Sequence, residues 1–519
     1  MNRLNLWPLL PVTALLLGLG WYFWQESTLA GGGGFPLDDS WIHLTLARNL
    51  SNGQGFAVNP GHPVGASTAP LWTLLLAGLF KVIGPCVPAV KYLGLLLTLL
   101  GLELIRRLYL AYRPGCRIEA ALAAALAALL PSTLWGAMSG LEIPLAILLV
   151  SGALLAHARL RGSGSWRCLV PPFLMGLAAL TRPEALLVFP LSLLDSPGRS
   201  DLKHLLGRSL AFLLPLIPVF LFHITTHGAP LPTTFYAKIH NSLNPAGGQG
   251  LFWALSTGSL EATCKLLCYW SINHLGLFLK SLLFASPFLV LLLPLGMKYC
   301  ITPPNYLNHP LMLPLLALVF VPLAMGIFSP RPDLGAGDRY VSFLNPVIAV
   351  LTAAGLFLAL RLLPKWAASA TVILMVVSLF SAVHHGAMYH ARCVKNTEQM
   401  HVQLSHWVQK NLPPGSTVAV HDIGALSFHC HHHLLDLVGI ATPEFLNHKR
   451  NPDLLFSALY RLRPDYLIVA PNWYPDLVRH TDIFIPIHMQ QIPPEESLIL
   501  AGPTMVVYRA EWPGNASGK

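Results

Sequence analysis

Two adjacent carboxylates, Asp38 and Asp39, follow the first apolar segment of this 519-residue sequence, in the stretch FPLDDSWIHLTLARNL. An ionised carboxylate with little access to water serves as a general base or as a metal ligand, because both tasks need an anionic oxygen. The alternative role is helix capping, in which Asp39 or Ser40 accepts the free backbone N–H groups that open a helix over WIHLTLARNL. The spacing alone favours capping. Both roles are compatible if one aspartate caps the helix and the other faces a cavity.

Three cations at the ends of apolar segments form a second group of candidates: Arg182 in LTRPEALL, Lys238 in LPTTFYAKIH and Arg339 in GAGDRYVSFLNP. Each suits a lipid phosphate, because guanidinium and ammonium groups pair with phosphate oxygens. For any one of them alone, snorkelling to a headgroup at the membrane surface is the stronger interpretation. Three of them on the face that also carries the two aspartates favour a phosphate-binding site.

The same segments hold further polar candidates for the site: Glu142, Glu184, Tyr236, His43 and Asp338. Glu142 follows SGL and Glu184 follows TRP. Each of these two glutamates could equally cap a helix or pair with a nearby arginine.

A metal site has less support. The histidine-rich C-terminal segment contains His421, His429, His431, His432 and His433. In an extended HCHHH stretch alternate side chains point to opposite faces, so at most two or three converge, and a polar strand end or turn is favoured over zinc. Cys264 and Cys268 share a face if their segment is helical, but two ligands do not make a site. We predict no metal site and no required cofactor, although a divalent cation held by Asp39 is compatible with the sequence.

The composition defines the class of protein. Hydrophobic residues make up 54% of the chain and charged residues only 11%, with a mean hydropathy of +0.56, whereas charged residues are about 25% of a soluble protein. The net charge of +10 does not point to nucleic acid, because the basic residues are spread over short loops between apolar runs. A P-loop, a GxGxxG motif and a CxxC motif are all missing from the sequence, so a nucleotide-driven pump has no support.

About eleven apolar segments are candidates for transmembrane helices, each needing about 20 apolar residues, although several are shorter. They are 6–24, 87–105, 118–134, 143–158, 168–180, 184–194, 209–224, 274–297, 309–328, 341–360 and 367–387. We interpret the first as an uncleaved helix, because Trp21 to Trp24 are too bulky for a cleavage site. The segment 71–83 is apolar but short, and is expected to lie at the membrane interface. The turn TRPE joins two short helices into a hairpin.

The positions of lysine and arginine predict a cytoplasmic N-terminus, since positively charged loops stay inside. The opposite face then carries the loop 25–86, the turns WGAMSGLE and TRPE, the loop 225–273, the segment 329–340 and everything after about 388. The candidate site residues gather on this outer face.

Residues 388–519 are more polar and predict a small α/β domain outside the membrane, following a transmembrane domain over 1–387. An amphipathic helix over MHVQLSHWVQKNL is followed by strands in PPGSTVAVHD, HLLDLVGI, DYLIVA and TMVVYRA, with a helix near Leu454 to Leu462. Within this domain Cys393 and Cys430 either form one disulfide or remain two buried thiols, and the sequence does not choose between them.

Several blocks together resemble a known family. The run DDSWIHLTLARNLSNGQGFAVNPGHPVGASTAPLWTLLLA resembles the first outer loop of bacterial C-type (GT-C) glycosyltransferases, especially those akin to mycobacterial terminal arabinofuranosyltransferases. The blocks SGLEIP, LTRPEALL, GAPLPTTFYAK, GDRYVSFLNP and HDIGALSFHCHHHLLDLVGIATPEF follow in the same order as in that group. The resemblance spans about Asp38 to Glu444. It departs from the group at Gly65-Ala66, where Glu-Gly is usual, and at Ser40-Trp41, where Ala-Tyr is common.

The resemblance implies an inverting transferase in the bacterial inner membrane, which moves a sugar from a polyprenyl-phosphate carrier to a glycan, lipid or protein acceptor at the periplasmic face. In the wider superfamily, which includes protein O-mannosyltransferases and lipid A aminoarabinose transferases, the first acidic residue of this loop is the proposed base. That role carries over to Asp38, with Asp39 as its neighbour. Arg182, Lys238 or Arg339 would then stabilise the leaving phosphate.

Other functions remain open on the sequence alone. They are a related transferase such as an O-antigen ligase or polymerase, a transporter or flippase for lipid-linked sugars, and a membrane scaffold without enzymatic activity. A transporter typically has charged or broken helices near the bilayer midplane, often in paired halves. The charged residues here collect at one face, which favours the enzyme. The fold class that we predict is therefore a polytopic α-helical membrane protein with a C-terminal soluble α/β domain.

Overall fold

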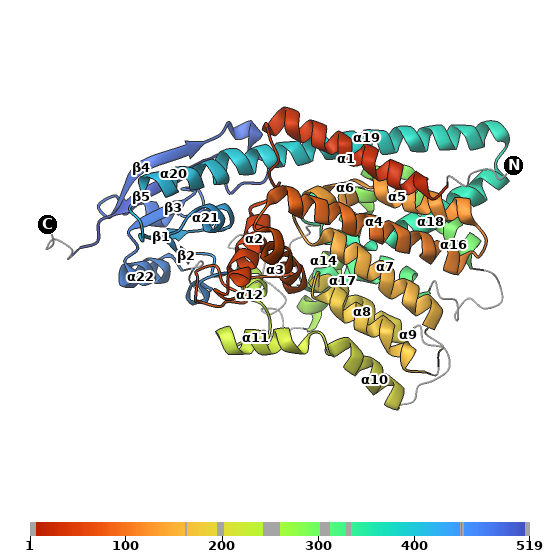
Figure 1. The fold of residues 1–519 in the computed structure, drawn as a ribbon, viewed down its shortest axis with the longest axis horizontal. Coiled ribbons are helices and arrows are strands. Elements are labelled where there is room, and N and C mark those ends of the chain that lie inside the picture. The colour runs from red at the N-terminus through yellow and green to blue at the C-terminus, as the bar shows by residue number, and fades with distance from the viewer. Residues whose placement is uncertain are drawn as a thin grey trace. The chain divides into compact units, whose positions relative to one another are not determined.

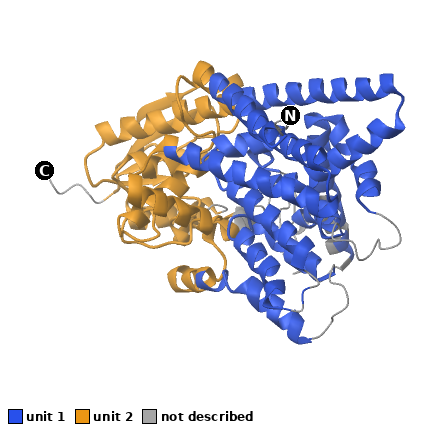
Figure 2. Cartoon of the chain, turned by 45° about the vertical axis from the view of Figure 1, so that its right-hand side comes forward, with its two compact units in different colours: residues 1–25, 89–218, 246–389 blue, residues 26–88, 219–245, 390–519 orange. Residues whose placement is uncertain are grey.

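The computed structural model describes residues 7–160, 163, 165–194, 202–241, 260–301, 312–328, 334–446, 448 and 451–513. The chain forms two compact units, coloured separately in Figure 2. Unit 1 consists of Met1–Gln25, Ala89–Pro218 and Ala246–Tyr389, and unit 2 of Glu26–Pro88, Val219–Pro245 and His390–Lys519. The first predicted outer loop therefore belongs to the same unit as the C-terminal segment. The predicted boundary of the membrane domain at 387 stays a prediction, because compactness does not say which residues lie in the bilayer.

Helices make up unit 1 (Figure 1). They are most of α1 (Leu9–Ala30), α4 (Val87–Tyr112), α5 (Arg117–Leu129), α6 (Pro131–Met138), α7 (Ile143–Leu160), α8 (Val170–Ala179), α9 (Val188–Leu194), α10 (Leu202–Leu213), α14 (Leu260–Ala285), α15 (Pro287–Leu291), α16 (Leu293–Cys300), α17 (Met312–Phe328), α18 (Asn345–Leu362) and most of α19 (Lys365–Thr397). Among the described residues four helices are long and apolar enough to cross a membrane, and up to seven spans result if three bent pairs each count as one. This does not confirm the predicted eleven.

Three predicted spans are broken. The span predicted over 118–134 is α5 and α6, bent by 61°, and the span over 209–224 is α10 and α11 (Ile217–His227), bent by 54°. The span predicted over 274–297 turns by 119° after Ala285. Prolines explain two of the breaks: Pro131 opens α6, and Pro287 opens α15 after Ser286, whose hydroxyl caps the helix by accepting the N–H of Phe288. A proline has no N–H and excludes the helical conformation from the residue before it.

At the end of the last predicted span, a helix that was predicted to stop continues instead. We predicted a span over 367–387 and a separate amphipathic helix from Met400, but α19 continues through a π-helical turn, Glu398–Val402, into α20 (Gln403–Asn411). The helix has 47 residues from Lys365 to Asn411. Residues 388–399 contain neither proline nor glycine, so nothing in the sequence ends the helix there.

Unit 2 is built on a five-stranded sheet with the order β2-β1-β3-β5-β4. The strands are β1 (Thr417–Val420), β2 (His433–Asp436), β3 (Tyr466–Val469), β4 (Phe484–Gln491) and β5 (Thr504–Ala510). β1 pairs in parallel with β2 and β3, whereas β5 pairs antiparallel with β3 and β4. Four strands and α22 (Pro452–Leu462) lie where the sequence predicted them. The sequence analysis missed β4, because Pro486 argues against a strand and is tolerated only at a sheet edge.

The first loop covers one face of this sheet. It contains α2 (Asp38–Ser51) and α3 (Pro70–Ile83), and a further helix of the unit is α12 (Thr233–Asn241). The buried cluster on this face joins strand, loop and helix residues: Val418, Val420, Ile468, Ile42, Leu46, Leu404 and Val408. The opposite face packs on α22 through Leu455 and Leu459. Cys393 and Cys430 are both buried, and the structure contains them as two thiols and not as a disulfide.

Two glycines let α16 and α18 pack closely in unit 1. A Cβ atom added at Gly296 would collide with the carbonyl oxygen of Leu351, and one added at Gly355 would collide with the carbonyl oxygen of Leu292. Backbone atoms of the facing helix cannot rotate away as a side chain can. The close approach therefore requires glycine at both positions.

We expect Gly355→Val to destabilise unit 1 by at least about 1–3 kcal/mol, because the helices must separate. The measurement is the thermal unfolding midpoint of the full-length protein in detergent. The matched control is Gly20→Val in α1, where an added Cβ meets nothing within 4 Å. Equal midpoints for the two variants would contradict the close packing of α16 and α18.

Candidate functional site

The helix α2 begins at Asp38, so both aspartates lie in its first turn. The N-cap residue is Leu37, and no side chain caps the helix. The capping role considered for Asp39 and Ser40 is therefore wrong, because both residues are already inside the helix. Two carboxylates in a first turn still complement the partial positive charge of the helix N-terminus.

Asp38 caps a different helix. Its Oδ2 accepts the backbone N–H of Gly424 at 2.7 Å, and its Oδ1 accepts that of Ala425 at 2.8 Å. These are the first two residues of the short helix α21 (Gly424–His429), whose opening N–H groups have no partner within the helix. Gly424 also leaves room for the carboxylate, since a Cβ there would collide with Asp38.

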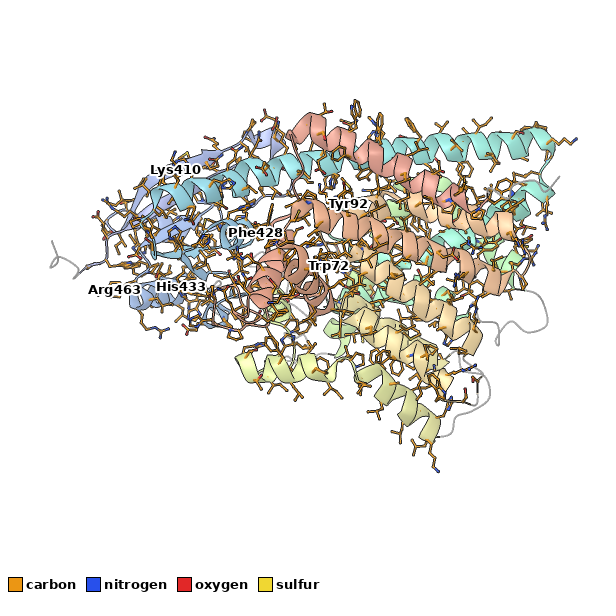
Figure 3. All side chains as sticks on the ribbon, in the orientation of Figure 1. Trp72, Tyr92, Lys410, Phe428, His433 and Arg463 are labelled. Carbon is orange, nitrogen blue, oxygen red and sulfur yellow. The ribbon has the colours of Figure 1, made fainter. Side chains whose placement is uncertain are left out.

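Arg48 holds the other end of α21. Its Nη1 donates to the carbonyl of Phe428 at 2.6 Å and its Nη2 to that of Ser427 at 3.1 Å. Between the two ends, the hydroxyls of Thr45 and Ser427 lie 2.9 Å apart in a buried hydrogen bond. The helix α2 thus lies beside α21, with an anion at the N-terminus of α21 and a cation at its C-terminus (Figure 1; Phe428 is labelled in Figure 3). Both charges complement the dipole of α21.

The surroundings of Asp38 change its acidity. The side chain is 15% exposed, and Nδ1 of His401 lies 4.0 Å from Oδ1. Burial raises the pKa of Asp38 above the ordinary value of 3.8; His401 and the two backbone N–H groups oppose this rise, and the charge of Asp422 adds to it. Asp422 is in turn 3.2 Å from Nε2 of His421. Asp38 therefore holds a proton at a higher pH than an ordinary aspartate.

A second buried carboxylate, Asp436, lies at the end of β2. It accepts the N–H groups of Val438 and Ala441, and its own N–H donates to Thr442. Burial raises the pKa of Asp436 to about 6. Its bonds stay within the turn that follows β2, so its role is to hold that turn.

The other candidates in unit 2 differ in position. Asp39 is exposed, one residue after Asp38. His43 is buried, with Nδ1 3.0 Å from the Thr73 hydroxyl, so it ties α2 to α3. Tyr236 is half-buried in α12, its ring 6.4 Å from that of His227. Lys238 is in the same helix, and its side chain lies outside the described residues.

In unit 1 the predicted outer turns WGAMSGLE, TRPE and GDRY meet. Arg182 is buried, with Nη1 2.5 Å from Oε1 of Glu142 and Nε 3.3 Å from Oε2 of Glu184. The guanidinium carbons of Arg182 and Arg339 lie 4.8 and 5.2 Å from the ring centre of Tyr340. Of the two roles considered for the glutamates, pairing with an arginine is the one that the structure shows. The positive charge of Arg182 is therefore balanced by two carboxylates.

The GDRY turn is fixed by Asp338 and Gly337. Asp338 has a positive φ of 55° and accepts a hydrogen bond from the hydroxyl of Ser281. Gly337 has φ of 67°, and a Cβ there would collide with the ring of Trp135 in the first of the three turns. The turn residues hold Arg339 and Tyr340 in place.

Sequence reasoning missed Arg48, His401, Tyr340 and the N-terminus of α21. Tyr340 directly follows the candidate Arg339. The block HDIGAL, which contains the N-terminus of α21, was indicated only by the family resemblance. In the described part of the chain, no group of three or more histidine, cysteine, aspartate or glutamate residues is arranged to hold a metal ion. The HCHHH stretch spans the end of α21, a turn and the start of β2.

Comparisons with known proteins place this geometry in a fold. A family model described as Domain of unknown function (DUF8728) matches residues 389–509, and no curated protein matches the sequence. ArnT from Cupriavidus metallidurans bound to undecaprenyl phosphate is 13% identical, with a TM-score of 0.54 over 96% of this chain and 97% of that chain. The apo oligosaccharyltransferase of Archaeoglobus fulgidus is 12% identical, with a TM-score of 0.57 over 90% of this chain and 70% of that one. AglB from Archaeoglobus fulgidus in complex with an inhibitory peptide and a dolichol-phosphate is 12% identical, with a TM-score of 0.53 over 88% and 69%.

The chain shares the fold of these structures. Among the described residues this fold combines helices that are long and apolar enough to cross a membrane with a small C-terminal sheet domain. The GT-C resemblance drawn from the sequence is thus confirmed in fold. The closer resemblance to mycobacterial arabinofuranosyltransferases, the orientation in the membrane and the number of spans stay predictions.

We expect Arg48→Ala to loosen α21, because two carbonyls at its C-terminus lose charged donors worth about 1.5–3 kcal/mol each. Amide hydrogen exchange of residues 424–430 in the full-length protein should become at least about tenfold faster. The control is Arg509→Ala on β5 of the same unit, which breaks only an exposed pair with Glu511. Unchanged exchange in Arg48→Ala would show that α21 does not depend on α2.

Proposed function

We propose that the protein is an inverting glycosyltransferase that moves a sugar from a polyprenyl-phosphate carrier to a cell-envelope acceptor at the outer face of a bacterial inner membrane. The observation that carries the proposal is a buried, oriented carboxylate at the start of the first loop, in a chain whose fold matches ArnT bound to undecaprenyl phosphate over 96% of its length. The archaeal structure with a dolichol-phosphate supports the same class of donor.

In this mechanism Asp38 is the general base. The acceptor hydroxyl oxygen bonds to the anomeric carbon of the donor sugar while the bond from that carbon to the phosphate oxygen breaks. The hydroxyl proton passes to the Asp38 carboxylate, and the polyprenyl phosphate leaves with the electron pair. A carboxylate offers about four acceptor positions, so the two bonds to α21 leave lone pairs for this proton.

Lys238 and Arg339 stabilise the negative charge that develops on the leaving phosphate, with Arg182 in support. Because Glu142 and Glu184 balance the charge of Arg182, it adds less positive potential than its position in the sequence suggested. Tyr340 contacts both arginines and orients them. No step of this mechanism requires a divalent ion, although a similar structure was crystallised with zinc and Asp39 is the residue that we would expect to hold one.

The partners implied are a lipid-linked sugar donor, an acceptor that is a glycan, lipid or protein, and the surrounding membrane lipids. In this proposal the N-terminus is cytoplasmic and residues 388–519 are periplasmic. The sugar and the acceptor are identified by mass spectrometry of lipid and glycan extracts from cells with and without the gene.

The test is Asp38→Asn, expressed in cells that lack the gene. Transfer should fall about 10²–10⁴-fold, because the amide cannot take the proton. The lipid-phosphate sugar should then accumulate, and the sugar should disappear from the glycan extract. Asparagine also offers only one acceptor oxygen to the two N–H groups of α21, so a structural control is needed.

Thr45→Ala supplies that control, because it removes the buried hydrogen bond to Ser427 and loosens α21 without removing a carboxylate. We expect it to retain most of the transfer activity. The base role is refuted if Asp38→Asn transfers sugar as fast as the wild type. It is also refuted if Thr45→Ala, at an α21 amide exchange rate equal to that of Asp38→Asn, loses as much transfer activity as Asp38→Asn does.

The pH profile gives an independent test. The pKa of Asp38 is raised. As the pH falls, the base therefore becomes protonated at a higher pH than an ordinary aspartate would, and transfer declines there. Asp422→Asn removes a negative charge that raises this pKa, so the acid limb should move to lower pH. His401→Gln removes an opposing positive charge and should move it to higher pH. The profile is measured with membranes as the source of donor and acceptor, and an acid limb that neither variant moves would count against Asp38.

A further inference from the structure

A cavity of about 310 Å³ lies in unit 2 where α2 ends and α21 turns into β2. Its lining includes Asn52, Gln54 and Asn59 from the first loop, and His431 and His432 from the histidine-rich turn. Every residue of the lining belongs to unit 2. Phe428 and His433, which precede and follow His431 and His432 in the sequence, are labelled in Figure 3.

Two amides make the walls rigid. Nδ2 of Asn49 donates to the carbonyls of Ala57 and Val58 at 2.9 and 3.0 Å. Asn59 bonds to Leu434 in both directions, with Nδ2 donating to the carbonyl at 2.8 Å and Oδ1 accepting the N–H at 2.9 Å. The first loop and β2 are therefore tied together across the cavity.

His432 lines this space with unused hydrogen-bonding capacity. Its side chain is buried, with 8% exposure, and the backbone of Val408 is within hydrogen-bonding reach of the ring, which leaves at least one ring nitrogen without a hydrogen bond to any residue that the structure describes. A buried polar group left without a partner costs about 1–3 kcal/mol, so a bound partner is expected. Burial lowers the pKa of His432, so this ring takes up a proton less readily than an ordinary histidine, and the neutral ring offers one donor and one acceptor.

The chemistry of the lining favours a neutral ligand rich in hydroxyl groups. Asn52 and Gln54 are exposed at the rim, and each amide both donates and accepts, as a sugar hydroxyl does. Among the described lining residues the one permanently charged cation is Arg48, which donates three of its five N–H groups, to Asn49, Ser427 and Phe428. A phosphate would therefore reach only the two remaining N–H groups, and a lipid tail would leave the polar groups unsatisfied.

The cavity is also distant from the reacting group. Asp38 contacts the first residues of α21, Gly424 and Ala425, whereas the lining begins at Ser427 in the same helix and extends to Arg48, about 15 Å further along α2 at about 1.5 Å per residue. A ligand seated against Asn59 and His432 therefore lies beyond the end of α21 that faces away from Asp38. Binding at such a distance can still contribute to catalysis by holding a longer substrate in register.

We propose that this cavity binds a sugar residue of the acceptor glycan other than the one whose hydroxyl reacts. Its assignment to the acceptor rests on the proposed function, whereas its binding of carbohydrate rests on the cavity itself. The acceptor is then an oligosaccharide or polysaccharide, and single sugars are poor acceptors.

The experiment measures binding without transfer. Wild-type full-length protein in detergent is titrated with neutral hexose and pentose oligosaccharides of two to six residues, and contact is followed by saturation-transfer NMR. We expect at least one of these probes to bind, Gln54→Ala and Asn52→Ala to weaken it at least tenfold, and Gln491→Ala, an exposed amide on β4, to leave it unchanged. His432→Phe, which fills the space without hydrogen bonds, should abolish binding, with unfolding midpoints checked for every variant.

The outcomes separate this inference from the proposed function. Absence of binding to every probe, equal weakening by Gln491→Ala, or displacement of the probe by inorganic phosphate would each overturn the carbohydrate site, while transfer in cells would stand. Binding that depends on Gln54 and His432 supports the site even if Asp38→Asn leaves transfer intact, in which case the proposed function fails alone.

Discussion

The contact of the Asp38 carboxylate with the first two N–H groups of α21 is the constraint on which unit 2 depends. A six-residue helix has no stability of its own, because too few hydrogen bonds offset the ordering of its backbone. The helix α2 supplies what is missing, with an anion at one end of α21 and Arg48 at the other. The parallel strands β1 and β2 have their carboxyl ends on the same side of the sheet, and α21 follows β1 there. The sheet thereby positions α21, and α21 in turn positions the carboxylate of Asp38.

This contact gives Asp38 two properties that oppose each other. The backbone N–H groups stabilise the charged carboxylate, whereas burial and Asp422 favour its protonated form, and burial is the largest of these effects. A carboxylate held from two sides also cannot rotate. Fixed orientation removes the reorganisation that an exposed aspartate would need before accepting a proton. The residue that stabilises α21 is for this reason also suited to chemistry, and the same bonds that position it limit the lone pairs that it can offer.

Local patterns in the sequence predicted what local physics determines. Apolar length located the helices, alternation located four strands, and the break at Pro287 was readable in principle because Ser-Pro ends a helix. The edge strand with Pro486 and the uninterrupted helix through residue 398 were missed because tertiary context overrides local preference there. The partner of Asp38 lies 386 residues away, and nothing near Gly424 in the sequence announces an acidic neighbour. The ordered blocks of the resemblance indicated that both segments matter, but not that they touch.

Two of the candidate charges, Arg182 and Asp38, are already compensated, and under the proposed function this limits how a phosphorylated donor is recognised. Arg182 lies between two carboxylates, and Asp38 lies on two N–H groups beside His401. Burying an uncompensated charge is far more unfavourable than burying a paired one, which explains why neither group stands alone. A phosphate that approaches Arg182 also meets Glu142 and Glu184. Coulomb energy falls with distance, so the phosphate is attracted only where it lies closer to the guanidinium groups than to the carboxylates. Recognition in such a site follows from the geometry of the turns that hold Arg182 and Arg339, and not from net positive charge.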